Sequence, residues 1–578
     1  MRIKGILNKI LKVIANQKKR IILSACLALI SVIANLFGPW LIGKAIDAML
    51  GMQAVNFSLI LQLLFAILIT YIVYSISLYL LTICTNKIAY DTSHKLRAKL
   101  FRKLNTLPLK YYDTTPHGDI VSRFINDCDT VSDALLQSIS TFLTGIIMIA
   151  GAIIFMLRLH VLMAFIVILS APLAYYVAKF ITMKSKSSFQ AQADILGELN
   201  GYAEEMISAE KVVQAFRYEP KSINHFKKIN EKLYLAGIKA QFYSSLTNPT
   251  TRVVNNIGYT VVGIVGAYLA INDALSVGTI STFLLYANLF SKPFNEITGV
   301  IPQIQSAFAS LVRIFTILDE SEEEKVKPLT RPLKFKGEVV FHNVCFSYDP
   351  SKMLISSLNL HIKPGQKVAI VGGTGAGKTT LINLLMRFYD IQEGSITIDG
   401  VNIYHISRKD LRDNFGMVLQ DTWLFNGTIK ENIAYAKADA SQDEIINVAI
   451  SSGAHSFIKR LPKGYDTIIS EASGNLSEGQ KQLLAITRVM LTNPSILILD
   501  EATSSIDTIT ELHVQKAFLK MMQGKTSFII AHRLSTIKDA DLILVMEKGN
   551  VIESGTHTEL INKKGVYAKL YFSQFENS

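Results

Sequence analysis

Long uncharged apolar runs occupy the first half of this 578-residue chain and restrict its fold more than any other feature. A helix needs roughly 20 predominantly apolar residues to cross the hydrocarbon core of a bilayer. Five clear runs and a weaker sixth cover residues 21–43, 57–84, 138–157, 161–178, 253–272 and 274–291. No spanning run follows residue 332. We therefore expect a membrane domain over residues 1–320, a linker over 321–335 and a soluble domain over 336–578.

Lysine and arginine residues lie mainly on one side of the predicted membrane helices. They crowd the segment before the first run and the long loops after the second and fourth runs, whereas the other loops are short and nearly uncharged. By the positive-inside rule, both termini and the soluble domain are cytosolic. Basic groups beside a membrane meet anionic lipid headgroups, so the net charge of +13 indicates membrane lipids as partners and no nucleic acid.

The N-terminal segment carries apolar residues at helical spacing with lysines elsewhere, which is typical of an amphipathic helix lying in the membrane interface. A targeting peptide is the alternative, but the segment has no small-residue cleavage site and runs directly into the first long span. The apolar face of the expected helix is formed by Ile3, Ile6, Leu7, Ile10, Leu11 and Ile14.

The two long cytosolic loops, at about residues 87–133 and 180–252, have a helix-forming composition. They predict arms of roughly 20 residues that reach about 30 Å beyond the bilayer, and a short segment near the middle of each arm is suited to docking. From about residue 336, short apolar strands alternate with polar helices and glycine turns, which indicates an α/β domain with a largely parallel sheet. The expected fold class is a membrane α-helical bundle fused to an α/β domain.

The segment GGTGAGKT follows the apolar strand KVAIV and opens a helical pattern, as a phosphate-binding loop requires. Its glycines let backbone amides wrap phosphates at a helix N-terminus, Lys378 neutralises the outer phosphates, and the Thr379 hydroxyl can bind Mg²⁺. A structural glycine turn is the alternative, which the flanking strand and helix disfavour. The predicted ATP-binding residues of this loop are Gly372, Gly373, Thr374, Gly375, Ala376, Gly377, Lys378, Thr379 and Thr380.

Further polar residues follow three other apolar strands. The strand in SILILDE ends in Asp500, which can hold Mg²⁺, and Glu501, which can orient or deprotonate an attacking water. Gln420 and His532 also come directly after apolar strands. Ligands of open α/β sheets collect at the carboxyl ends of strands, so we expect these side chains near one phosphate. A solvated turn and a packed histidine are the alternative interpretations. The predicted Mg²⁺ ligands are Thr379, Gln420 and Asp500.

The order and approximate spacing of the phosphate loop, Gln420, LSEGQ, LILDEATSSID and His532 resemble the ATP-binding cassette (ABC) superfamily. Six predicted spans followed by one cassette resemble half of an ABC exporter, of the bacterial heterodimeric multidrug or lipid type, over essentially the whole chain. The resemblance implies ATP-driven export by alternating access across the plasma membrane, which is the inner or cell membrane of a bacterium. It also implies a second half-transporter as partner, because two cassettes close around two ATP molecules.

The resemblance also implies roles for single residues. Tyr348 would stack on the adenine of ATP, and Gln420 would report bound nucleotide to the membrane arms. Glu501 would be the catalytic carboxylate, and His532 would contact the γ-phosphate. Asp507 would lie in the loop that crosses to the opposite cassette.

The segment NLSEGQKQ departs from the family's usual Leu-Ser-Gly-Gly-Gln because Glu478 replaces the first glycine. The resemblance implies that Ser477, Glu478, Gly479 and Gln480 act on ATP held by the partner chain. A carboxylate pointing at a γ-phosphate about 4 Å away would repel it by about 4 kcal/mol at an effective dielectric of about 20. It should therefore turn aside, or its site should hydrolyse ATP poorly. Ser477 and Gln480 also have capping-box spacing, and Glu478 suits the first turn of a helix.

Because Glu501 is intact and Glu478 is altered, the chain resembles one half of a heterodimeric exporter. A homodimer with two equivalent sites is the alternative. An ATP-gated channel or a regulatory subunit is a different class, but the nearly uncharged spans favour export of an apolar or amphipathic solute, since ion pathways commonly contain ionisable groups. Drug-like molecules, lipids and small peptides remain open as substrates.

Overall fold

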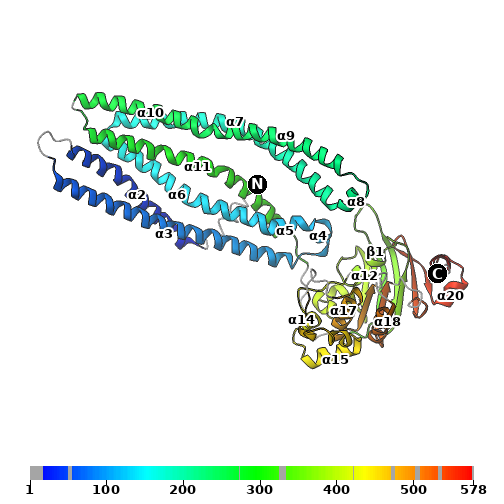
Figure 1. The fold of residues 1–578 in the computed structure, drawn as a ribbon. Helices are drawn as coiled ribbons and strands as arrows, with labels where there is room; N and C mark the ends of the chain where they lie inside the picture. The colour runs from blue at the N-terminus through cyan, green and yellow to red at the C-terminus, as the bar shows by residue number, and fades with distance from the viewer. Residues whose placement is uncertain are drawn as a thin grey trace. The chain divides into compact units, whose positions relative to one another are not determined.

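The computed structural model describes residues 17–49, 55–272, 274–323, 334–420, 422–469, 476–500, 508–530 and 537–575. The chain divides into two compact units. Unit 1 comprises Met1–Asn105 and His117–Glu320, and unit 2 comprises Thr106–Pro116 and Ser321–Ser578. Unit 1 is helical and unit 2 contains the sheets, which confirms the expected fold class (Figure 1). The N-terminal interfacial helix predicted from the sequence lies outside the described residues.

Long helices make up unit 1, and the predicted apolar runs fall in them. Five described stretches are long and apolar enough to cross a membrane: Lys18–Met49, Phe57–Leu104, His117–Leu159, Arg252–Ile271 and Val277–Leu318. The fourth predicted run lies within a further helix, α7. The elements are α2 (Lys18–Met49), α3 (Phe57–Leu104), α5 (His117–Ser122), the π-helix η1 (Arg123–Asp127), α6 (Cys128–Leu159), α7 (Val161–Ser208), α8 (Glu210–Ala215), α9 (Glu219–Ser245), α10 (Thr247–Ile271) and α11 (Val277–Leu318).

Helices α2 and α11 approach each other closely because small residues face each other. A Cβ atom added to Gly278 would lie 2.0 Å from the carbonyl oxygen of Gly43, so a larger side chain is excluded there. The amide of Gly278 donates to Asp47 (2.7 Å), and the buried Tyr286 hydroxyl donates to the carbonyl of Leu36 (2.7 Å). Close backbone approach with interhelical hydrogen bonds is how helices associate where lipid removes the hydrophobic driving force.

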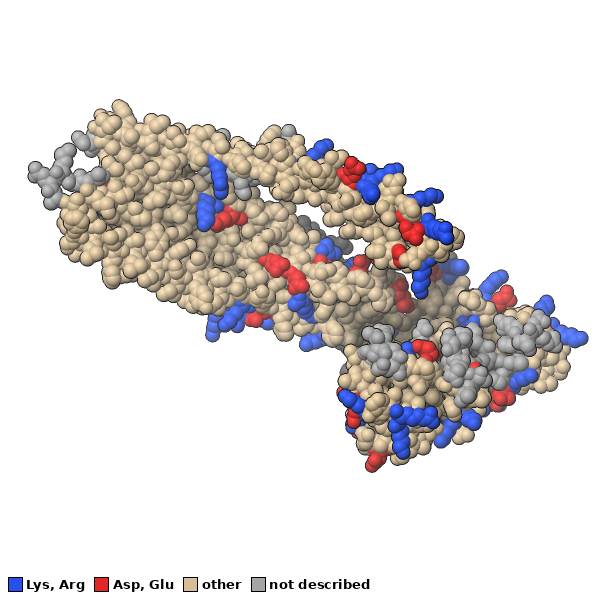
Figure 2. Space-filling view, viewed as in Figure 1, with Lys and Arg blue, Asp and Glu red and all other residues tan. Residues whose placement is uncertain are grey.

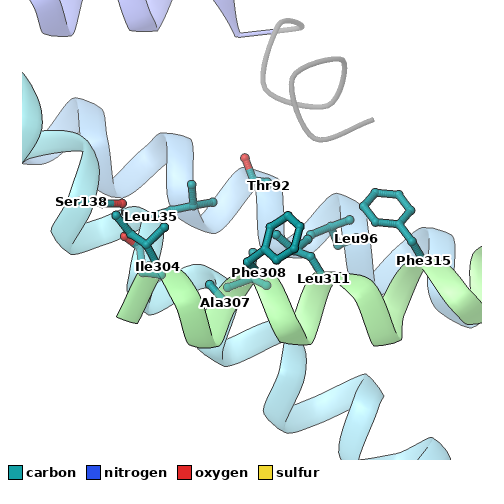
Figure 3. A pocket seen from close by; sticks show the side chains of 11 residues that line it. Thr92, Leu96, Leu135, Ser138, Ile304, Ala307, Phe308, Leu311 and Phe315 are labelled. Carbon is teal, nitrogen blue, oxygen red and sulfur yellow. Dashed lines mark hydrogen bonds between the residues drawn. The ribbon is translucent and has the colours of Figure 1, made fainter. Parts of the chain in front are cut away.

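An apolar cavity of about 150 Å³ lies between α3, α6 and α11 (Figure 3). Leu96, Leu135, Phe308 and Phe315 supply much of its wall. A dry cavity of this size and lining can hold an aromatic ring or a short stretch of an aliphatic chain. Its full lining is Thr92, Leu96, Val131, Ala134, Leu135, Ser138, Ile304, Ala307, Phe308, Leu311 and Phe315.

The second long loop forms an arm in which α7 and α9 run side by side and α8 joins their ends (Figure 1). The Tyr202 hydroxyl of α7 lies 3.2 Å from the Ser222 hydroxyl of α9, and its ring stacks near His225. Charged side chains gather along this arm, whereas the opposite end of the long helices shows almost none on the visible face (Figure 2). The charge pattern of unit 1 therefore agrees with helices that leave the membrane as polar arms.

Unit 2 is built around a six-stranded sheet with the order β12-β11-β3-β10-β9-β6. Strands β11, β3, β10, β9 and β6 are parallel, and β12 is an antiparallel edge. Side chains alternate between two apolar cores, one on each face, so the sheet is covered on both sides. The strands are β12 (Asn550–Gly555), β11 (Leu542–Glu547), β3 (Lys367–Val371), β10 (Thr526–Ile530), β9 (Ile496–Asp500) and β6 (Phe415–Val418).

The remaining elements of unit 2 flank this sheet. An antiparallel sheet contains β2 (Ile355–Ile362), β1 (Val339–Phe346), β4 (Glu393–Ile398) and β5 (Val401–Asn402), and a small one pairs β7 (Gly427–Thr428) with β8 (Ile468–Ile469). The helices are α4 (Leu109–Thr114), α12 (Lys378–Leu385), η2 (Ile403–His405), α13 (Arg408–Arg412), α14 (Ile429–Ala434), α15 (Gln442–Ser452), α16 (His455–Ile458), η3 (Gly464–Asp466), α17 (Glu478–Thr492), α18 (Thr508–Met522), α20 (His557–Asn562) and α21 (Val566–Phe575).

Candidate nucleotide site

The strand order of the main sheet brings the predicted site residues to one edge. The phosphate loop follows β3, Asp500 ends β9, and Gln420 follows β6. These three strands run parallel, with β10 between β3 and β9, so their carboxyl ends share an edge. This is where ligands bind in open α/β sheets. His532 follows β10 in the sequence, but it lies outside the described residues, as do Glu501 and Asp507.

The phosphate loop leaves β3 and enters α12 through a left-handed backbone turn. Gly377 precedes α12 with φ of 97°, and an added Cβ there would lie 2.9 Å from the Cα of Gly549, so both conformation and space require glycine. Gly373, Thr374 and Gly375 are exposed at the tip of the loop. The loop therefore presents open backbone at the N-terminal end of an eight-residue helix, where an anion is favoured.

Lys378 folds back over this loop. Its Nζ donates to the carbonyl oxygens of Gly372 (2.6 Å) and Gly373 (3.0 Å). Burial lowers the pKa of the Lys378 ammonium, and the nearby Asp500 carboxylate opposes that shift. A bound phosphate would further favour the charged ammonium by direct attraction. Lys378 is thus positioned to exchange its carbonyl contacts for the oxygens of a phosphate.

The predicted Mg²⁺ ligands fit the chemistry of that ion. The Thr379 hydroxyl, the Gln420 amide and the Asp500 carboxylate all offer hard oxygen atoms, which Mg²⁺ prefers. Asp500 ends β9, whose carboxyl end shares an edge of the sheet with the end of β3 that leads into the phosphate loop. The described residues hold no cluster of three or more His, Cys, Asp or Glu side chains.

Tyr348 lies beside the first turn of α12. Its hydroxyl lies 3.2 Å from the Thr380 hydroxyl and 3.4 Å from the Asn383 amide nitrogen. Its ring makes an edge-to-face contact with Tyr389 at a centroid distance of 4.9 Å and remains 44% exposed. A fixed and partly exposed ring next to the phosphate loop can stack on a nucleobase.

The signature residues form the start of α17. Ser477 and Gln480 make the expected capping box: the Gln480 amide donates to the Ser477 hydroxyl (3.3 Å) and the Ser477 amide donates to the Gln480 side chain (3.0 Å). The Glu478 carboxylate accepts from Lys481 Nζ (2.6 Å), while Gly479 is buried. The Glu478 carboxylate is therefore paired with a residue of its own helix. The i, i+3 spacing of Glu478 and Lys481 could have predicted this ion pair.

Unit 2 also contains a contact that the sequence did not predict. The docking segment expected in the first arm, residues 111–131, overlaps α4, which belongs to unit 2, and the Tyr389 hydroxyl donates to the Asp113 carboxylate. Burial and this carboxylate raise the pKa of Tyr389, so the phenol remains a donor at neutral pH. Nothing in the local pattern around Tyr389 indicates a partner that is so far away in the sequence.

Two family models match this chain: "ABC transporter transmembrane region" over residues 21–294 and "ABC transporter" over residues 355–504. An uncharacterized ABC transporter ATP-binding protein of Bacillus subtilis, YfiC, is 40% identical over 575 residues, which cover 99% of this chain and 95% of that protein. The chain belongs to the ABC transporters. It joins an ABC transmembrane region to an ABC ATPase domain, so it is one half of an ABC exporter that couples ATP hydrolysis to transport.

Other similar proteins support this family placement. A fatty acid ABC transporter ATP-binding/permease protein of Mycobacterium bovis is 41% identical over 518 residues, covering 90% of this chain and 82% of that one. A solved bacterial Atm1-family ABC exporter with ATP bound has a TM-score of 0.78 at 28% identity, and the match covers 97% of this chain and 99% of that chain. ABC exporters work as dimers, so this half-transporter requires a second half.

Proposed function

We propose that this half-transporter exports an amphipathic or apolar solute across the plasma membrane by alternating access. The observation that carries the proposal is the apolar cavity between α3, α6 and α11; among the described residues of its wall, the polar side chains are the hydroxyl groups of Thr92 and Ser138. An apolar group loses no hydrogen bonds on entering such a cavity, whereas an ion would lose its hydration. This favours an exporter over the alternative, an ATP-gated channel or a regulatory subunit.

The names of similar proteins narrow the substrate class. One is a fatty acid transporter, another is the ATP-dependent lipid A-core flippase of Desulfotalea psychrophila (38% identical, covering 86% of this chain and 87% of that one). A third is a probable multidrug resistance transporter of Bacillus subtilis (34% identical, covering 85% of this chain and 73% of that one). Lipids, fatty acids and many drugs are amphiphiles, so a lipid-like amphiphile is the substrate class that fits both these names and the cavity.

For the ATP site, we propose the roles given by the sequence. Tyr348 stacks on adenine, residues 372–380 hold the phosphates, and Lys378 neutralises them. Mg²⁺, held through Thr379, Gln420 and Asp500, would supply charge stabilisation to the phosphates. Glu501 orients the attacking water, His532 contacts the γ-phosphate and Asp507 lies at the cassette boundary. The signature residues Ser477–Gln480 act on the ATP of the partner.

For the dimer, we propose a heterodimer in which this chain supplies the phosphate loop and Glu501 of the competent site. Its altered signature, with Glu478, would then face a weakly hydrolysing site. The ion pair between Glu478 and Lys481 favours the second candidate, a homodimer, because it partly neutralises the carboxylate that would repel a phosphate. Both termini would be cytosolic in either assembly.

In either dimer, α8 would bind the partner chain. Val212 and Phe216 on and beside α8 are 57% and 79% exposed. The surface of unit 2 offers a matching aromatic patch, Trp423 and Tyr435, which are 58% and 61% exposed and follow Gln420 in the sequence. Large exposed apolar side chains of this kind mark interaction sites. We propose that α8 of each half packs on this patch of the other half.

Expression of this chain alone tests the assembly and the substrate class together. The purified protein would be measured for oligomeric state and for ATPase activity with fatty acids, phospholipids, lipophilic drugs and short peptides. The heterodimer proposal predicts a chain with little ATPase activity until a partner is added. A stable homodimer with full amphiphile-stimulated activity would defeat it and establish the second candidate. Stimulation by peptides alone would contradict the proposed substrate class.

A further inference from the structure

The C-terminal end of α12 is bound by an arginine from another helix. Arg412 of α13 donates from Nε to the carbonyl of Met386 (3.3 Å) and from Nη2 to the carbonyl of Arg387 (3.0 Å). Its guanidinium also lies 4.9 Å from the ring centroid of Phe388. These carbonyls lie just past the last turn of α12, where a cation is favoured by the helix dipole. Helix α13 is thus fastened to the helix whose other end carries Lys378.

The same arginine holds the linker that enters unit 2. Arg412 Nη2 lies 3.4 Å from Glu323 Oε1, and Arg408 Nε lies 3.7 Å from Glu323 Oε2. The side chains of Glu323 and Arg408 are only 24% and 12% exposed. Asp390, two residues after Phe388, also accepts from Arg408 Nη2 (3.0 Å). We call Glu323, Arg408 and Arg412 the linker clamp.

The linker clamp also reaches the segment Thr106–Pro116, which belongs to unit 2. The amide of Glu323 donates to the carbonyl of Thr106 (3.2 Å), at the beginning of this segment. Toward its other end, Asp113 accepts from Tyr389. Residues 386–390 therefore contact the segment Thr106–Pro116 directly, at Asp113. They also contact it indirectly, because Arg412 binds both their carbonyls and Glu323, whose amide donates to Thr106. The segment that follows α3 and the segment that follows α11 are thus held together near the C-terminal end of α12.

We propose that Glu323 is a positioning residue that couples the phosphate loop to the membrane helices through α12 and the linker clamp. Helix α12 has eight residues and so spans about 12 Å from Lys378 to the clamp. A movement of the loop on binding ATP would shift the end of α12, and the clamp would carry the linker and Thr106 with it. This proposal rests on the proposed function, because it assumes that nucleotide binds the phosphate loop. The linker clamp would couple bound nucleotide to the membrane helices independently of Gln420.

Partial burial strengthens the electrostatic attraction among Glu323, Arg408 and Arg412. A half-buried ion-pair network is screened less by solvent than an exposed pair, and removing one partner leaves the other charges without compensation. Glu323→Gln keeps the shape of the side chain and the amide contact with Thr106, but removes the charge. Glu338→Gln is a matched control, since Glu338 pairs with His361 in a mostly exposed contact of the same unit.

The experiment uses the assembled transporter in lipid vesicles, with this half carrying Glu323→Gln, Arg412→Gln, both, or Glu338→Gln. Binding of a fluorescent ATP analogue, basal ATPase activity and amphiphile-stimulated ATPase activity are measured for each. We expect ATP affinity and basal activity near wild type in Glu323→Gln, and a loss of stimulation of at least about fivefold. The double variant should lose no more than the more impaired single variant, because both changes break one contact.

The outcomes separate the two proposals. If the wild-type transporter binds no ATP analogue, the proposed function fails. If it binds ATP and is stimulated, but Glu323→Gln is stimulated equally, the linker clamp has no coupling role. Additive losses in the double variant would also overturn the clamp, since they would show independent effects. An equal loss in Glu338→Gln would assign the effect to the change of net charge and would likewise overturn it.

Discussion

The two arms that extend from the long helices carry short helices of the same length, α4 and α8, each with six residues. They differ in how far the chain covers them. Helix α4 belongs to unit 2 and contains no fully buried residue, but Tyr111 and Tyr112 are half-buried and Asp113 accepts a hydrogen bond from Tyr389. Beside α8, Phe216 is 79% exposed, and within α8 only Val213 is buried. One chain thus holds Asp113 of α4 by a contact of its own, whereas Phe216 beside α8 is left for the partner that we propose.

This difference has an energetic basis. An exposed phenylalanine forgoes about 1.5–3 kcal/mol of burial free energy, which is recovered when a second surface covers it. If the proposed dimer supplies this second surface, the position of α8 would depend on the partner cassette, whereas Asp113 of α4 is bound by Tyr389 of its own chain. Changes that keep the two cassettes together or apart should therefore alter the exposure of α8 and not that of α4.

Glu501→Gln should lower ATP turnover more than any other substitution considered, because it removes the carboxylate that orients water and leaves the phosphate loop intact. We expect ATP turnover to fall by about 10²- to 10⁴-fold while ATP binding persists.

If cassettes held together by ATP cover α8, a thiol introduced by Phe216→Cys into the Glu501→Gln variant should react slowly with a maleimide. The assembled chain without the added cysteine is the control. Fast labelling at saturating ATP would contradict coverage of α8 by the partner.

Lys378→Ala tests whether the protection of residue 216 from labelling depends on ATP binding at the phosphate loop. The ammonium makes charge-assisted contacts that backbone amides cannot replace, so ATP affinity should fall by about tenfold or more. Binding is measured with a fluorescent ATP analogue at equilibrium. ATP at a concentration that protects Phe216→Cys in the wild type should then fail to protect it. Wild-type affinity in this variant would remove Lys378 from the proposed phosphate site.

Phe216→Ala tests the exposed arm directly. Truncation of an aromatic anchor in an interface typically costs more than about 1 kcal/mol, so amphiphile-stimulated ATPase activity should fall by about fivefold or more at unchanged ATP affinity. Tyr234→Ala is the matched control, because Tyr234 on α9 is also highly exposed, at 65%. An equal loss in both variants would mean that α8 has no special role among the exposed aromatic residues of the arm.

The sequence predicts the elements of this molecule better than the contacts between them. Apolar runs of bilayer length and strand-to-helix glycine motifs are local patterns, and they predicted the helices of unit 1 and the edge of the sheet that carries Lys378 and Asp500. The ion pair between Glu478 and Lys481 is also local; it was not predicted, although its i, i+3 spacing could have indicated it.

The contacts of α4 and the linker clamp were not predicted because their partners are far apart in the sequence. Thr106 meets Glu323, and Asp113 meets Tyr389, only once the chain has folded back on itself. The sequence predicted docking equally for both arm segments, residues 111–131 and 204–219, because polar and apolar residues mix in both. Which of them the chain covers by itself depends on its topology and on a second subunit, and neither is written in a local pattern.

Tyr389→Phe should have the smallest effect, because it removes one hydrogen bond from the covered arm and leaves the ring packing against Tyr348 in place. A hydrogen bond to a charged acceptor contributes about 1.5–3 kcal/mol when buried, but Asp113 is exposed and water can replace the lost donor, so we expect the lower range of about 0.5–1 kcal/mol. Because the pKa of Tyr389 is raised, the phenol stays protonated through and above the usual titration range of tyrosine, so the contribution is present at neutral pH and is lost only as the pH rises through the raised pKa. Stimulated ATPase activity should therefore fall by about two- to fivefold at neutral pH, and Asp113→Asn should do the same without an additive loss in the double variant. A larger loss than that of Phe216→Ala would reverse the comparison, because it would make the covered arm the more sensitive of the two.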